Sequence, residues 1–452
     1  MSAPLENIKV LDLTHMLAGP YASMLIADLG AEVVKVEPPG KGEITRGLYK
    51  DHPDYSLDGV SPYHITLARN KKSLTLDLKQ EKGKQLFYEL VKKFDVVLDN
   101  FSSGVTERLG IDFPTLKKYN PKIITCSISG FGKGEADRPA YDQILQAYGG
   151  GMSITGKDEN HPVRAGIPIA DLSSGMFSII GILSALQKRD KDGIGDHVDI
   201  SMLDCQVSLL TYMATMNTIS GIEPKPIGNQ HFLHVPYNSY KTADGFIIIS
   251  VVHEDFWPNL LDALDLEEFR GEEYKTVQGR LADRKNIDKV ISEKLEHKPS
   301  SHWLDLLAKH RVPSGPINSV RDALEDPLVK KRNMIVDLEQ PSGSTAKMPG
   351  NPIKLESYEE NFSPAPELGE HTAEVLEKYL KISSEELDSL KSDKINKPSF
   401  HNISSRNTGI MVNNWLLISI LIVVFLGTLY PLATDLLYNQ SLTVGPQYYA
   451  IS

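Results

Sequence analysis

The sequence predicts an α/β protein built on an open parallel sheet, with a second, smaller α/β domain. Apolar strands and amphipathic helices alternate through the first half of the chain. Strand–helix–strand units of this kind run parallel through right-handed crossovers. The length of 452 residues also exceeds what one domain normally holds, so more than one domain is expected.

The first half supplies the elements of the parallel sheet in order. Strands are predicted at 8–13, 31–37, 73–78, 95–100 and 122–130, with helices at 20–30 and 81–94 between them. The stretch after residue 187 is interpreted as a Gly-rich turn followed by another helix. Ligands of open α/β sheets bind beyond the carboxyl ends of the strands, so the residues that follow these strands are candidate site residues.

The chain changes character after residue 224. PYNSYKTADGFIIISVV (236–252) predicts two strands joined by an Asp-Gly turn, and charged amphipathic helices follow. We therefore expect a large domain at 1–224 and a small domain at 225–320. A late helix is predicted at 368–380, after the Pro-rich segment 341–352.

Composition and missing motifs exclude several function classes. The net charge of −11 argues against broad nucleic-acid binding. Cys126 and Cys205 are expected to be reduced core residues, and MSAPLENIKVLDL shows no signal peptide, so a cytoplasmic location is expected. The sequence lacks G-x-G-x-x-G, P-loop, H-E-x-x-H and G-x-S-x-G motifs and any Cys/His cluster at metal-ligand spacing, which argues against NAD, a metal site and a hydrolase serine.

The C-terminus differs from the rest of the chain. WLLISILIVVFLGTLYPLA (415–433) is uncharged and about long enough to cross a bilayer, which makes it a candidate transmembrane helix and membrane tether. A polar linker at 396–412 precedes it, and the segment 413–452 is interpreted as foreign to the soluble body.

Asp171 lies where an apolar extended run meets an apolar helix that is expected to begin near Leu172. A buried carboxylate without a partner is costly, so this acid either caps the helix or acts as a nucleophile or general base. From this stretch alone the cap is favoured.

Four further groups of polar and aromatic residues are candidates for ligand binding. Each also has a structural interpretation, such as a solvated turn or a loop held by its own side chains. The groups are Arg69, Lys71 and Lys72; Asn100, Phe101 and Arg108; Tyr141, Asp142 and Gln143; and Gly228, Asn229, Gln230, His231 and His234.

Eight segments taken in order closely resemble the family III CoA-transferases, which include formyl-CoA and carnitine CoA-transferases. The segments are 15–47, 70–79, 95–110, 141–156, 169–186, 228–245, 312–327 and 368–376, and the resemblance covers residues 5–392. It implies a Rossmann-like large domain, an interlocked homodimer and a return segment, 321–395, that completes the large domain. It also implies coenzyme A as substrate and product, with no permanently bound cofactor.

The resemblance assigns roles to individual residues. The family's catalytic aspartate falls on Asp171. The implied CoA contacts are Met16, Leu17, Ala18, Lys72, Leu74, Asn100, Phe101 and Arg108, and the candidate substrate contacts are Tyr141, Asp142, Gly228, Asn229, Gln230 and His231. Pro38 stands where some members have a basic residue, so Lys41 or Arg46 would have to replace it. The short GNQH loop replaces a run of glycines found in oxalate-specific members, which argues against oxalate or formate as substrate.

The chemistry implied for Asp171 passes through an aspartyl anhydride and an aspartyl-CoA thioester, and the acceptor carboxylate then repeats the exchange. The helix N-terminus is expected to keep the acid ionised and to offer N–H groups to oxyanions. The acids that donate and accept CoA are left open.

Two alternatives stay open. An α-methylacyl-CoA racemase would share this fold, but Tyr141 stands where those proteins have a histidine base. A catalytically inactive, membrane-tethered binding protein is the second. The tail at 413–449 resembles a segment of the cytochrome c biogenesis haem lyase, and we infer a fusion, a truncated neighbour or an assembly join without a haem function.

Overall fold

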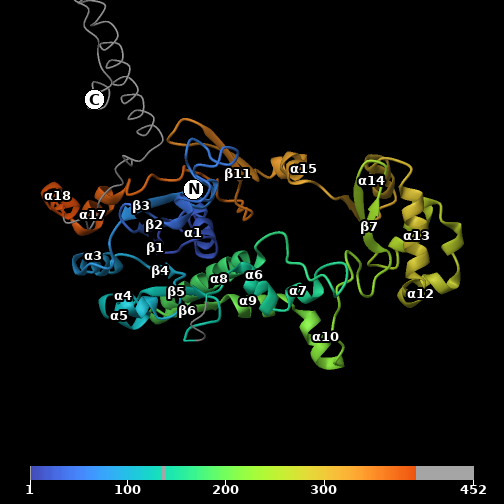
Figure 1. Ribbon diagram of the computed structural model, residues 1–452, viewed down its shortest axis with the longest axis horizontal. Helices are drawn as coiled ribbons and strands as arrows, with labels where there is room; N and C mark the ends of the chain where they lie inside the picture. Colours follow the sequence, from blue (N-terminus) through green and yellow to red (C-terminus); the bar gives the residue numbers. More distant parts are fainter. Residues whose placement is uncertain (1, 135–138, 393–452) are drawn as a thin grey trace, which may run out of the picture.

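The core of the protein is an open parallel sheet with helices packed around it (Figure 1). The strand order reverses within this sheet, between β1 and β4. The computed structural model describes residues 2–134 and 139–392. Six strands lie in the order β3-β2-β1-β4-β5-β6, and all neighbouring pairs are parallel. The strands are β1 (Lys9–Asp12), β2 (Glu32–Glu37), β3 (Lys71–Thr75), β4 (Val96–Asp99), β5 (Ile124–Ser129) and β6 (His197–Ser201).

Helices cover both faces of this sheet. Helices α1 (Ala18–Asp28) and α8 (Ile169–Asp192) share one apolar cluster with the strands, and the other cluster contains α3 (Glu81–Val91), α5 (Phe113–Tyr119) and the late helix α17 (Thr372–Leu380). The predicted α/β class with a parallel sheet is therefore confirmed. Cys126 and Cys205 are buried free thiols, as predicted.

The remaining helices of this part connect the strands or follow the sheet. They are α2 (Pro62–Leu67), α4 (Val105–Leu109), α6 (Asp142–Tyr148), α7 (Gly151–Ile154), α9 (Met202–Leu209), α10 (Tyr212–Ser220), α15 (Val320–Glu325), α16 (Pro327–Lys331) and α18 (Ser384–Ser392), with a 3₁₀ turn η1 (Ile44–Arg46).

A second lobe lies at the opposite end of the molecule (Figure 1). The predicted hairpin is present as β7 (Tyr237–Lys241) paired with β8 (Phe246–Ser250), and β9 (Ser314–Pro316) adds a third antiparallel strand. Its own apolar cluster runs from Val235 to Val312. Its helices are α11 (Phe256–Leu264), η2 (Glu267–Phe269), η3 (Glu272–Lys275), α12 (Val277–Ala282), α13 (Arg284–Leu295) and α14 (Ser300–Lys309).

Three strand regions were not predicted, of which β9 is one. The segment interpreted as a Gly-rich turn contains β6, an edge strand whose HVDIS sequence holds few apolar residues because only one neighbour covers it. The Pro-rich segment 341–352 is part of a hairpin, β10 (Ile335–Glu339) with β11 (Thr345–Pro349). Its polar turn and alternating burial gave no continuous apolar run.

Helix α8 is, among the described residues, long and apolar enough to cross a membrane by length and composition alone. Half of its apolar window is buried inside the protein, as in a core helix. The predicted membrane helix at 415–433 and the linker at 396–412 lie outside the described residues, as does the segment that resembles the haem lyase.

Gly175 lets α8 approach α1 closely, because a Cβ atom there would lie 2.7 Å from the backbone oxygen of Ala18. We expect Gly175→Ala to lower the free energy of unfolding by about 1–2 kcal/mol, since the clash outweighs the gain in helix propensity. Urea unfolding measures this change. Gly315→Ala, which meets no atom within 4 Å, is the control, and equal stability of the two variants would contradict the prediction.

Candidate active site

Asp171 lies in the first turn of α8, two residues after the first helical residue, Ile169. The helix begins earlier than predicted, and Pro168 occupies the N-cap position without a side-chain cap. The preferred interpretation of Asp171 as the N-cap is therefore wrong. Its carboxylate is free of that structural task.

Asp142 instead satisfies the exposed end of α8. One oxygen of its carboxylate accepts hydrogen bonds from the backbone N–H of Ala170 at 2.9 Å and of Asp171 at 3.4 Å. The other oxygen accepts a bond from Gln146 Nε2 at 2.7 Å. Asp142 is the first residue of α6, so this contact fixes the two helices to each other.

Burial and the neighbouring charge of Asp142 raise the pKa of Asp171 to about 7. The sequence-based expectation of a carboxylate kept ionised by the helix N-terminus is thus corrected. The N–H groups that would have stabilised it are bonded to Asp142. Near neutral pH, Asp171 exchanges between its acid and carboxylate forms.

Asp171 lines a cavity of about 330 Å³ at the carboxyl ends of β1, β4 and β5. This is the position where the strand order reverses, and ligands of open α/β sheets bind there. Its walls come from the turns that follow each of these strands and from α8. They include His15, Met16, Leu17, Ala18, Ile44, Asn100, Phe101, Gly130, Phe131, Tyr141 and Asp171.

Backbone donors at the start of α1 lie in this wall without an acceptor among the described residues. In the described part of the chain, the N–H groups of Leu17 and Ala18 donate to no protein acceptor. They lie at the N-terminal end of α1, where the helix dipole favours an anion. The cavity therefore combines an acid of raised pKa with unpaired hydrogen-bond donors.

The structure brings six of the implied catalytic and CoA-contact residues together in this cavity: Met16, Leu17, Ala18, Asn100, Phe101 and Asp171. The side-chain amide of Asn100 is engaged with the chain itself. It accepts a bond from the His15 N–H at 2.8 Å and donates to the His15 carbonyl at 2.7 Å. Tyr141 also lines the cavity, whereas Asp142 does not line it and instead bonds the first turn of α8.

The basic residues near the start of β3 do not line the cavity. Lys72 pairs with Glu32 at 3.0 Å and Glu374 at 2.7 Å. Arg69 and Lys71 are buried in ion pairs with Asp28 and Asp12. These partners balance the three charges within the protein, and the CoA contact of Lys72 stays a prediction.

Other implied contacts also lie apart from the cavity walls. Leu74 is fully buried in the core beneath α3, and Arg108 lies on α4. Arg46, which was expected to replace a basic residue at Pro38, forms two bonds to Glu37, at 2.6 and 2.7 Å. Lys41 is exposed. Whether these residues contact CoA stays a prediction.

The loop Gly228–His231 precedes β7 and does not line the cavity of its own chain. Residues of the second lobe hold it. Arg284 donates to Gln230 at 3.2 Å, Gln230 donates to Asp288 at 3.2 Å, and Asn229 donates to Ser239 at 2.9 Å.

Sequence analysis missed His15, Ile44 and Phe131 as cavity residues. His15 and Phe131 follow β1 and β5 directly, so the rule that ligands bind beyond strand ends could have found them. Ile44 reaches the cavity through the loop after β2, which no sequence pattern indicated.

Comparison with known proteins identifies the family. The model of CoA-transferase family III matches residues 5–372. The chain belongs to this family. It is an enzyme that transfers CoA between acyl-CoA thioesters and carboxylic acids.

Curated relatives cover most of this CoA-transferase. It is 34% identical over 393 residues to a human succinyl-CoA:glutarate CoA-transferase, covering 86% of this chain and 89% of the relative. A succinyl-CoA:mesaconate CoA-transferase of Haloarcula hispanica is 36% identical, with 82% of this chain and 96% of the relative covered.

A solved structure has the same architecture. A CaiB/BaiF family protein from Brucella suis superimposes with a TM-score of 0.75 at 34% identity, and the match covers 84% of this chain and all of that protein, 100%. The parallel sheet and the flanking helices are therefore the fold of this family.

The raised pKa of Asp171 predicts a specific effect on stability. The folded protein holds a proton on Asp171 up to about pH 7, whereas the unfolded chain releases it near pH 4, so Asp171 destabilises the fold increasingly from pH 4 to 7. We expect Asp171→Asn to be more stable than the wild type by roughly 2–4 kcal/mol at pH 8 and equal to it near pH 4.

Urea unfolding at several pH values measures this difference. Asp142→Asn is the matched variant. Loss of the Asp142 charge lowers the pKa of Asp171, so the stability of this variant should change less between pH 4 and pH 7. A difference between wild type and Asp171→Asn that does not change with pH would contradict the prediction.

Proposed function

We propose that this CoA-transferase works by covalent catalysis with Asp171 as the nucleophile. The observation that carries the proposal is that Asp171 lines the same cavity as Leu17 and Ala18, whose N–H groups donate to no acceptor in the described part of the chain. The resemblance to family III assigns the same residue. The carboxylate form reacts, and it is populated near neutral pH.

The reaction begins with attack of a carboxylate oxygen of Asp171 on the thioester carbonyl carbon. The carbon–sulfur bond breaks, CoA leaves as the thiolate, and an aspartyl anhydride remains. The thiolate then attacks the aspartyl carbonyl carbon, which releases the donor acid as its carboxylate and leaves an aspartyl-CoA thioester.

The second half repeats these steps in reverse with the acceptor acid. Its carboxylate attacks the aspartyl-CoA carbonyl carbon and displaces the thiolate, which then attacks the acyl carbonyl of the new anhydride. The acceptor leaves as its CoA thioester, and Asp171 is regenerated. Each tetrahedral intermediate carries an oxyanion, and the N–H groups of Leu17 and Ala18 are suitable donors for it.

Succinyl-CoA is the proposed donor, and a short dicarboxylic acid such as glutarate or mesaconate is the proposed acceptor. The relatives named for these reactions cover more than four-fifths of the chain, at 34% and 36% identity. Relatives named for oxalate are also present, at 35% and 34% identity. The GNQH loop in place of a glycine run favours the longer acids.

A homodimer is the proposed assembly. Apolar side chains on the outer face of α8 and on α10 are exposed: Met176 by 43%, Ile180 by 59%, Met216 by 45% and Ile219 by 81%. Exposed large apolar side chains on two helices are typical of an interface between subunits. Two separate chain connections join the lobes, before β7 and after β9, an arrangement that an interlocked pair of subunits would fit (Figure 1).

Asp171→Ala should lose CoA transfer from succinyl-CoA to glutarate or mesaconate by at least about a thousandfold, because the variant cannot form the anhydride. Transfer is measured by chromatography of the acyl-CoA products. Incubation of the wild type with succinyl-CoA, followed by hydroxylamine, should give a mass change on the peptide that contains Asp171.

The racemase alternative predicts that the wild type exchanges the α-proton of the acyl group for deuterium without any acceptor acid. Tyr141→Phe is the control for this exchange, because Tyr141 stands where racemases have a histidine base. Full transferase activity in Asp171→Ala, together with no adduct on its peptide, would refute the proposed nucleophile.

The dimer gives a further prediction. The wild type should sediment at about twice its chain mass of 50.2 kDa, and Ile180→Asp should weaken the association because it places a charge in the apolar face. Analytical ultracentrifugation over a concentration series measures both. Leu328→Asp, at a residue 71% exposed on α16, is the control, and a monomeric wild type would contradict the assembly.

A further inference from the structure

The turn between β1 and α1 contains a residue with an unfavourable backbone conformation. Met16 has a φ of 66°, in the left-handed region that residues other than glycine seldom adopt. Met16, Leu17 and Ala18 are the residues that line the cavity from this side. Interactions from other elements must therefore keep the turn in place.

Three side chains from three different elements hold the backbone of this turn. Glu43 Oε1 accepts a hydrogen bond from the Met16 N–H at 2.8 Å. Lys35 Nζ, from β2, donates to the Thr14 carbonyl at 2.7 Å. Asn100, after β4, bonds both the N–H and the carbonyl of His15.

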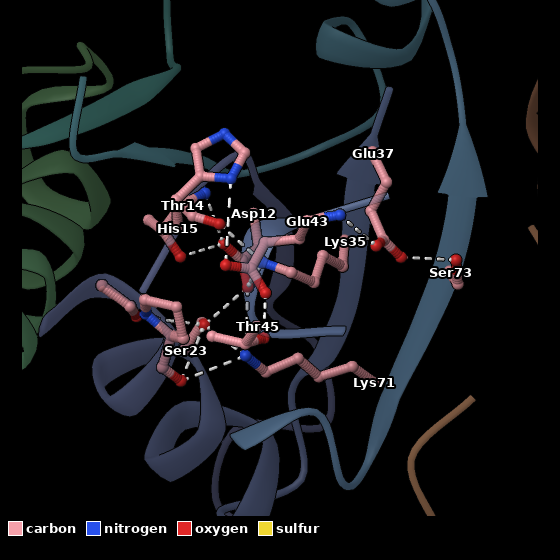
Figure 2. Close-up of polar contacts among 12 residues, drawn as sticks. Asp12, Thr14, His15, Ser23, Lys35, Glu37, Glu43, Thr45, Lys71 and Ser73 are labelled. Carbon is pink, nitrogen blue, oxygen red and sulfur yellow. Dashed lines mark hydrogen bonds and ion pairs between the residues drawn. The ribbon is translucent and has the colours of Figure 1, made fainter. Parts of the chain in front are cut away.

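Glu43 belongs to a buried cluster of charged side chains shown in Figure 2. Asp12 forms ion pairs with Lys35 and Lys71, Glu37 pairs with Arg46, and Glu43 Oε1 lies 3.9 Å from His15 Nδ1. Glu43 is 2% exposed, its other oxygen accepts a bond from the Thr45 hydroxyl, and its N–H donates to Glu37 at 3.0 Å. Truncation of this side chain would leave the Met16 N–H and the Thr45 hydroxyl without their acceptor.

The position of Glu43 connects two walls of the cavity. Its carboxylate holds Met16, and the next residue, Ile44, also lines the cavity and is 56% exposed. Because the Glu43 side chain is itself buried, it acts on a ligand only through the backbone that it holds.

We propose that Glu43 is a positioning residue for acyl-CoA: it holds the Met16 peptide so that the N–H groups of Leu17 and Ala18 face the cavity. The inference rests on the proposed function, in which this turn binds the thioester. Glu43 contacts neither substrate nor reacting atoms, so it differs in role from Asp171.

The test compares Glu43→Ala and Glu43→Gln with the wild type in the full-length protein. Alanine removes both acceptor oxygens, whereas glutamine keeps one acceptor for Met16 and loses the charge. We expect the KM for succinyl-CoA and the Kd for coenzyme A, measured by calorimetry, to rise about tenfold in Glu43→Ala and less in Glu43→Gln. The kcat should fall as well, because the same N–H groups are the proposed oxyanion donors, whereas the KM for the acceptor acid should stay within about twofold.

Asp28→Asn is the matched control. Asp28 is also a fully buried, ion-paired carboxylate, but it pairs with Arg69 at the far end of α1. This control should lower the melting temperature without changing the KM for succinyl-CoA. If both Glu43 variants behave like it, with lower stability and unchanged affinity, Glu43 is only structural and the inference is overturned.

The affinity measurement separates this inference from the proposed function. If the wild type binds coenzyme A but transfers none, the proposed function fails, and the Kd values of the Glu43 variants still decide the inference. If the wild type binds no coenzyme A, both are overturned. Should Glu43→Ala fail to fold, Glu43→Met, which is of similar length and removes both carboxylate oxygens, replaces it, and its KM and Kd decide.

Discussion

The buried carboxylate of Asp12 is the interaction on which the cavity depends. It lies at the end of β1 and accepts bonds from the Thr14 N–H at 2.9 Å and the Ser23 hydroxyl at 2.6 Å. Burial alone would raise its pKa, but the charges of Lys35 and Lys71 hold that pKa well below the usual range. Asp12 thereby joins the end of β1, the following turn and α1. Without this junction the turn at Met16 would have no fixed position.

The need to fix the turn after β1 also explains why so many charged side chains are buried next to the cavity. The sheet order reverses between β1 and β4, so the two turns separate and leave a crevice. Backbone N–H and C=O groups that line such a crevice need hydrogen-bond partners from side chains of the surrounding elements. Lys35 reaches them from β2, and Glu43 reaches them from the loop after β2. Removal of one charge from these buried ion pairs therefore destabilises the fold.

Asp171 and Asp142 show a conflict between stability and reactivity. Asp142 satisfies the N–H groups at the start of α8, but its charge and the burial of the site raise the pKa of Asp171 to about 7. A carboxylate of raised pKa is a stronger nucleophile than an ordinary one, yet it destabilises the fold when ionised. Gly175 adds to this arrangement, because it lets α8 bring Asp171 close to the turn on α1.

The sequence by itself determined the parallel α/β sheet, the β7–β8 hairpin and the family. Apolar runs, strand–helix order and eight ordered segments are local features that do not depend on packing. It did not reveal β6 or the β10–β11 hairpin, whose edge positions require few apolar residues.

Only the tertiary structure decided which polar residues share a site. Lys72 and Arg46 carry the charges expected of phosphate ligands, yet partners distant in sequence or across a loop bind them. Asp171 follows an extended run as a cap would, yet the helix starts earlier and Asp142 caps it. Glu43 had no sequence signal at all. The physical reason is that the role of a polar side chain depends on which groups lie within bonding distance of it. Folding brings those groups from other elements of the chain.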